Sequence, residues 1–120
     1  MKTALEESIS ADEQKFGTGL DSSCSTSSPQ LFTAKCGAQA DATSDVAGLA
    51  LREIDGRAGF HTLDASAREL QAAVRTYDSL GCAAGPTAAD VRRACLGPAA
   101  AIAQGFSDLR DGANLALAGK

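Results

Sequence analysis

Four cysteines, arranged as two close pairs, constrain this 120-residue chain more than any other feature. Cys24 and Cys36 flank a serine-rich stretch that contains a proline, and Cys82 and Cys95 flank a second short loop with a proline. Neither pair has the C-x2–4-C spacing of zinc sites, and there is no CxxC redox motif. An even number of cysteines in a small chain favours a disulfide framework, with free thiols or a metal site as the alternatives.

Three pairings of the cysteines are possible, and the local context favours Cys24–Cys36 and Cys82–Cys95. In each pair the first cysteine follows the expected end of a helix, and the second stands near a glycine after a helical stretch. Each bond would close a short loop, which stabilises the fold by about 3 kcal/mol on the chain-entropy model. Because disulfides persist in oxidising compartments, we expect a secreted or extracytoplasmic protein whose precursor carries an export signal absent from this sequence.

The composition favours closely packed helices. Leu, Ile, Val and Phe together make up only 22 of the 120 residues, whereas alanine alone accounts for 25. Alanine is the best helix former but buries little apolar area, so the core should be thin and should benefit from cross-links. No period-2 alternation of apolar residues predicts a strand.

The apolar spacing predicts an antiparallel four-helix bundle that forms a single domain over residues 1–120. The expected helices cover residues 2–20, 28–55, 63–80 and 87–116. Leu20 is placed on the apolar stripe of the first helix, and Ser28 with Pro29 should begin the second. We expect the last helix to break at Gly97-Pro98, because proline disfavours helix at the preceding residue and a break would help Cys95 to reach Cys82.

The two cysteine pairs, each joining a helical hairpin, give the chain an architecture that resembles the plant pectin methylesterase inhibitors. In that family also the first cysteine pairs with the second and the third with the fourth, within a four-helix bundle. The second pair is closer together here, and no other motif agrees. The resemblance therefore implies an architecture, and it carries no site residue and no activity.

The residues contain no recognisable catalytic or cofactor-binding set. His61, the only histidine, has no glutamate three residues before it, and the serines of residues 22–28 have no partner base in a known motif. The formal net charge is -4, and the pair Arg92-Arg93 is the only basic cluster. We therefore expect no enzyme activity, no cofactor, no metal and no nucleic-acid partner. No apolar run approaches the roughly 18 residues of a membrane span.

Two hypotheses of function follow from these features. The first is a secreted or cell-envelope domain that binds another protein, or a second copy of itself, through helix faces. Apolar residues outside the main helix stripes, namely Leu49, Leu51 and Leu115, would form that surface. The alternative is a carrier that holds an apolar or haem-like ligand between its helices. The candidate cavity residues are Phe16, Phe32, Phe60, His61, Tyr77 and Phe106.

Overall fold

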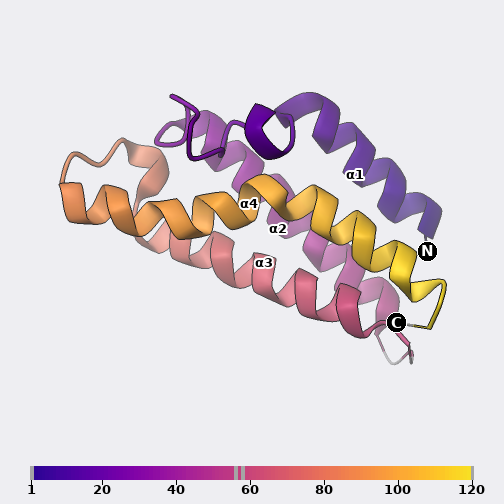
Figure 1. The fold of residues 1–120 in the computed structure, drawn as a ribbon. Helices are drawn as coiled ribbons and strands as arrows, with labels where there is room; N and C mark the ends of the chain where they lie inside the picture. Colours follow the sequence, from indigo (N-terminus) through magenta and orange to yellow (C-terminus); the bar gives the residue numbers. More distant parts are fainter. Residues whose placement is uncertain (1, 56, 58, 120) are drawn as a thin grey trace.

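The computed structural model describes residues 2–55, 57 and 59–119, with side chains from residue 4 onward. Within these ranges the chain is all-helical and has no strand. Its four α-helices are α1 (Lys2–Phe16), α2 (Ala34–Ile54), α3 (His61–Ser79) and α4 (Ala89–Ala116), joined in part by the short 3-10 helices η1 (Gly19–Asp21) and η2 (Cys82–Ala84). The helices pack as an elongated bundle (Figure 1), whose radius of gyration of 14.1 Å is that of a compact chain of this length.

Both predicted disulfides are present. Cys24 is bonded to Cys36 with their Cα atoms 4.9 Å apart, and Cys82 is bonded to Cys95 with their Cα atoms 5.9 Å apart. The chain has no free cysteine. All four side chains are fully buried, so the two bonds are part of the core.

The first two helices are shorter than the sequence predicted. α1 ends at Phe16, because Gly17 takes the left-handed backbone conformation (φ +79°) and starts a sharp turn into η1. α2 begins at Ala34, where Thr33 is the N-cap and accepts a hydrogen bond from the Lys35 amide. Ser28 and Pro29 belong instead to a series of tight turns over residues 22–33. These turns bring Cys24 back toward α2, which a helix starting at residue 28 would not do.

The predicted break at Gly97-Pro98 is wrong, because α4 runs without interruption for 28 residues with Pro98 inside it. Proline removes one helical hydrogen bond, to the carbonyl of Ala94, but Ala94 is exposed and water can solvate that carbonyl group. Cys95 needs no break to reach Cys82. Residues 85–88 carry the chain outward past η2 before α4 begins, so that the second turn of α4 lies beside Cys82 (Figure 1).

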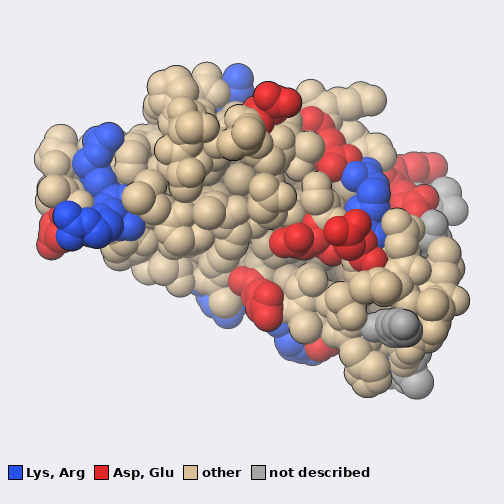
Figure 2. All heavy atoms as spheres, viewed as in Figure 1, with Lys and Arg blue, Asp and Glu red and all other residues tan. Residues whose placement is uncertain are grey.

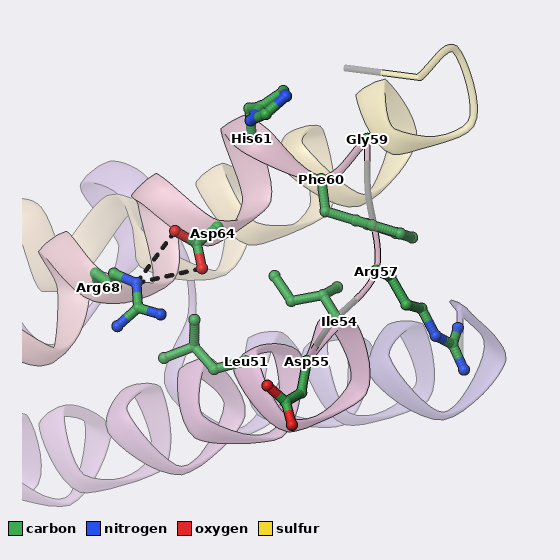
Figure 3. Close-up of a pocket in the computed structure, with 9 residues that line it drawn as sticks. All are labelled: Leu51, Ile54, Asp55, Arg57, Gly59, Phe60, His61, Asp64 and Arg68. Atoms are coloured by element: carbon green, nitrogen blue, oxygen red, sulfur yellow. Dashed lines mark hydrogen bonds and ion pairs between the residues drawn. The ribbon is translucent and has the colours of Figure 1, made fainter.

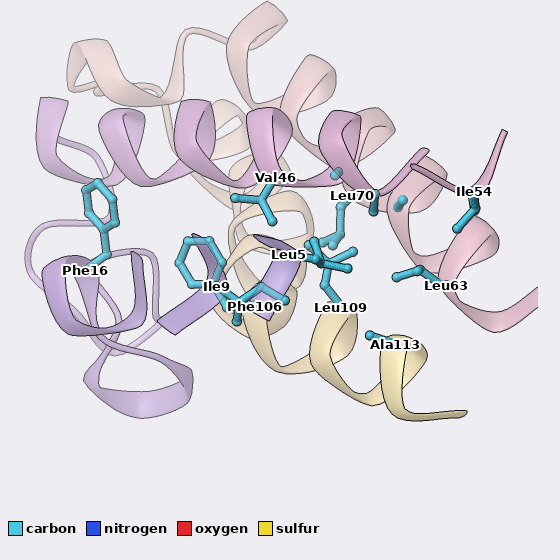
Figure 4. Close-up of a cluster of buried hydrophobic side chains, with 13 residues drawn as sticks. Leu5, Ile9, Phe16, Val46, Ile54, Leu63, Leu70, Phe106, Leu109 and Ala113 are labelled. Atoms are coloured by element: carbon cyan, nitrogen blue, oxygen red, sulfur yellow. The ribbon is translucent and has the colours of Figure 1, made fainter. Parts of the chain in front are cut away.

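The core consists of two clusters of buried side chains. The stapled cluster contains both disulfides, three alanines and four larger side chains; its members are Cys24, Leu31, Cys36, Ala40, Val74, Tyr77, Cys82, Cys95, Ala99, Ile102 and Ala103. The open cluster has no disulfide and larger side chains contributed by all four helices (Figure 4). Its members are Leu5, Ile9, Phe16, Val46, Ala47, Ala50, Ile54, Leu63, Ala67, Leu70, Phe106, Leu109 and Ala113.

Two buried glycines of α4 let α3 approach closely. A Cβ atom on Gly112 would lie 2.9 Å from the Cα atom of Leu63, and one on Gly105 would lie 3.1 Å from a methyl group of Leu70. The glycines are seven residues apart, as are the two leucines, and the pairing shows that α3 and α4 are antiparallel. This glycine seam holds α4 closely against α3.

Candidate functional site

The serine-rich stretch around Cys24 is a structural corner. The Ser22 hydroxyl donates a hydrogen bond to Oε1 of Gln39 (2.8 Å) and accepts one from the Cys24 amide (3.0 Å). Ser22 is only 2 % exposed, and Gln39 is fully buried in α2. These contacts fix the loop to α2, so Ser22 is satisfied within the fold and serves as a structural hydroxyl.

A surface pocket, here called the corner pocket, lies where the end of α2 meets the start of α3 (Figure 3). Its volume is about 270 Å³. Leu51 and Ile54 of α2 point across it toward Asp64 and Arg68 of α3, whereas His61 points away. The residues that line the pocket are Leu51, Ile54, Asp55, Arg57, Gly59, Phe60, His61, Asp64 and Arg68.

The charges inside the corner pocket neutralise one another. The Nε atom of Arg68 donates to both carboxylate oxygens of Asp64, at 3.2 and 3.1 Å. Both side chains remain substantially exposed, so this ion pair contributes little to stability. An open pocket smaller than the roughly 300–1,000 Å³ of typical ligand sites can accept a single side chain of a partner more readily than a haem.

The residues predicted to line one ligand cavity lie apart from one another. Phe16 and Phe106 belong to the open cluster, and Phe60 and His61 line the corner pocket. Tyr77 lies in the stapled cluster; its hydroxyl donates to the carbonyl oxygen of Leu31 (2.8 Å), and burial together with the nearby Asp78 raises its pKa to about 12.

Phe32 is half-buried beside the same cluster, under the guanidinium group of Arg92, which lies 4.1 Å from the ring centre. Arg92 also donates to the carbonyl oxygen of Pro86 (3.0 Å). These contacts hold the loop before α4 against the start of α2. These contacts are structural. They occupy Arg92, the first residue of the basic pair Arg92-Arg93.

The leucines predicted to form a partner surface differ in exposure. Leu49 and Leu51 are half-buried and pack against the open cluster, while Leu115 is 40 % exposed near the end of α4. Among the described residues, the most exposed large apolar side chain is Leu20, at 84 %, although its spacing predicted a place on the buried stripe of the first helix. The sequence contains a feature that could have predicted this exposure, because the glycines at positions 17 and 19 end the helix before Leu20.

Leu20 lies on a broad surface without charges, here called the uncharged face. It consists of Leu20 in η1 and the exposed residues Leu96, Gly97, Ala100 and Gln104 of α4. Residues 94–107 and residues 22–34 contain no charged side chain, so the adjoining surface is also neutral apart from Asp21. Figure 2 shows this neutral surface between a basic end and an acidic end of the molecule.

A hydrogen bond and a shared groove connect the η1 region to α4 beside the uncharged face. The hydroxyl groups of Thr18 and Ser107 are hydrogen-bonded at 3.1 Å, and a shallow groove of about 130 Å³ lies between η1 and α4. Gly19, Leu20, Ala100 and Gln104 are among the residues that line this groove. The face is therefore built on α4, which the glycine seam holds against α3.

Opposite charges flank the uncharged face along α4. Arg93 precedes it, and Asp108 and Asp111 follow it. Burial, together with the neighbouring Asp111 and Glu69, raises the pKa of Asp108. Arg110 does not relieve this repulsion, because it forms an ion pair with Glu13 of α1 and donates to the Ser10 hydroxyl (3.2 Å).

Among the described residues there is no group of three or more His, Cys, Asp or Glu side chains that could hold a metal ion. In the same residues, no helix has both the length and the apolar character needed to cross a membrane. The chain matches no protein-family model, no curated protein and no solved structure. Its function must therefore be argued from its own residues.

Proposed function

We propose that this chain is a non-enzymatic interaction domain of the secreted space or cell envelope, and that it binds a protein partner through the uncharged face. The observation that carries the proposal is the 84 % exposure of Leu20 on a surface without neighbouring charges on α4. Depletion of charged residues distinguishes the centre of protein interfaces from the remaining surface. The two disulfides support an oxidising location.

The side chains of the face suit it for binding at low entropic cost. Gly97 and Ala100 have no side-chain rotamers to lose, and Leu20 loses about 0.5–1 kcal/mol when it is immobilised. The Cys24–Cys36 disulfide holds the loop that follows η1, and the glycine seam holds α4. A partner would thus meet a surface that is already ordered, which favours affinity.

Position-specific photo-cross-linking tests this proposal. A photoreactive amino acid replaces Leu20 in one variant and Thr76, which is exposed on α3, in the control variant. Each protein is irradiated with the extracytoplasmic proteins of its source cells and alone. We expect a discrete protein adduct from position 20 and none from position 76. Equal labelling from both positions, or no adduct from position 20, would contradict the proposal.

A further inference from the structure

We propose that the uncharged face is occupied by a second copy of this chain, with the two α4 helices antiparallel about a two-fold axis near Ala100 and Ala101. The inference rests on the proposed function, because it names the partner of that same surface. It is carried by the distribution of charge along α4 and by the small residues at the centre of the face.

The residues concerned form one exposed stripe of α4. Arg93, Gly97, Ala100, Gln104 and Asp108 follow one another at intervals of three or four residues, which places them on the same side of a helix. All five are exposed. The stripe thus begins with a cation and ends with an anion, about four turns or roughly 22 Å away.

Antiparallel pairing of two such stripes places the cation of each copy opposite the anion of the other. When Ala100 lies opposite Ala101 of the second copy, Gly97 faces Gln104 and Arg93 faces Asp108. Because a two-fold axis makes each contact twice, two Arg–Asp pairs would close the two ends of the interface. Parallel pairing would instead place Arg93 against Arg93 and Asp108 against Asp108.

Among the described residues, the charges at the ends of the stripe have no side-chain partner. No side-chain hydrogen bond or ion pair joins Arg93, Asp108 or Asp111 to another residue in the part of the chain that the structure describes. Arg92 and Arg110, the nearest alternatives, are already used within the fold. A second copy would supply Asp108 with a cation, which the described residues of its own chain do not provide.

The centre of the stripe permits close contact between the two helices. Gly97, Ala100 and Ala101 present at most one methyl group each, so the helix axes can approach to about 8 Å. Each copy carries a net charge of -4, and contact through the uncharged face brings no like charges together at its centre. Leu20 and Leu96 are the only large apolar side chains on the face, so we expect a weak dimer in the micromolar range.

A charge exchange tests the pairing. Sedimentation of the intact, non-reduced protein is measured for the natural chain, for Arg93→Glu, for Asp108→Arg and for the double variant. Each single change breaks two exposed ion pairs and should weaken the dimer about tenfold, whereas the double variant should restore affinity to near its natural value. Arg75→Glu, an equal change at an exposed site on α3, should have little effect. Equal weakening by Arg75→Glu, or no restoration in the double variant, would overturn the inference.

An engineered cysteine tests the position of the axis. Because the chain has no free cysteine, Ala100→Cys introduces a single thiol near the proposed axis, and Ala72→Cys introduces one at an exposed site on α3 as the control. Under mild oxidation we expect a covalent dimer from Ala100→Cys alone. A chain that sediments as a monomer up to about 1 mM and gives no such dimer would overturn the second copy as partner. A position-20 adduct with a different protein would then still support the proposed function, so the two failures are distinguishable.

Discussion

The two ends of the bundle are held together in different ways. At one end, the stapled cluster combines two buried disulfides with three alanines and four larger side chains. At the other end, the open cluster has no disulfide, but leucine, isoleucine and phenylalanine side chains from all four helices fill it. The comparison indicates that the cross-links lie at the end where this alanine-rich chain buries fewer large side chains.

Removal of either disulfide should have the largest effect on stability, and it should act mainly at the stapled end. One double variant removes the first disulfide (Cys24→Ala/Cys36→Ala), and another removes the second (Cys82→Ala/Cys95→Ala). We expect each to lose about 2–5 kcal/mol of unfolding free energy in urea titrations. Hydrogen exchange should rise first at the start of α2 and in η2, while the glycine seam stays protected. Uniform loss of protection along all four helices would show that the two ends do not differ.

A methyl group added in the glycine seam should have the next largest effect on stability. Gly112→Ala places a Cβ atom 2.9 Å from the backbone of Leu63, so α3 and α4 must separate. We expect a loss of about 1–3 kcal/mol of unfolding free energy. Gly97→Ala is the matched control, because nothing lies within 4 Å of its Cβ position, and its better helix propensity should stabilise by up to about 1 kcal/mol. Similar effects of the two changes would contradict the close packing.

The hydroxyl group of Tyr77 should contribute less to the stability of the stapled end than the disulfides do. Tyr77→Phe removes the donor to the Leu31 carbonyl and leaves that buried acceptor without its partner. We expect a loss of about 1–2 kcal/mol in thermal or urea unfolding, with little change in the fold. An unchanged stability would show that Leu31 finds another donor.

The smallest predicted effect is a dependence of stability on pH. Burial and neighbouring carboxylates raise the pKa values of Asp12, Asp78 and Asp108 above the ordinary value of 3.8. The folded state therefore binds protons more readily than the unfolded state. Stability should rise as the pH falls from 7 through these raised pKa values, and this gain should be complete below about 3.8.

Replacement of one carboxylate separates this effect from others. Asp108→Asn should reduce the gain in stability on acidification and should stabilise the protein slightly at pH 7, because it removes repulsion with Asp111 and Glu69. The measurement is the free energy of unfolding at a series of pH values, at a protein concentration low enough to keep the chain monomeric. A natural chain that loses stability steadily between pH 7 and 4 would contradict the prediction.

Much of the fold could be predicted from local patterns. The all-helical class followed from alanine content and apolar spacing, and both disulfide pairings followed from the neighbourhood of Cys24, Cys36, Cys82 and Cys95. The continuity of α4 through Pro98 could not be predicted from local sequence. It depends on the exposure of Ala94, whose carbonyl group loses its helical partner, and on the path of residues 85–88. Local preference favoured a break, and tertiary packing overrode it.

The candidate site was harder to predict than the fold. Leu49, Leu51 and Leu115 stood out because they lie outside the helix stripes, yet the first two pack against the open cluster. Leu20 has the right spacing for the buried stripe of α1, and only the backbone turn at Gly17 removes it from that stripe. The uncharged face joins residues about 80 positions apart, so no local pattern could show it.

Nuclear magnetic resonance during dilution tests the central claim most directly. Amide spectra of the isotope-labelled chain, recorded from about 1 mM down to about 10 µM, report which residues change their surroundings as contacts are lost. The account predicts concentration-dependent shifts confined to η1 and to residues 93–108 of α4, with α3 unaffected. Shifts centred on α3 or on the corner pocket, or spectra that do not change with concentration, would contradict it.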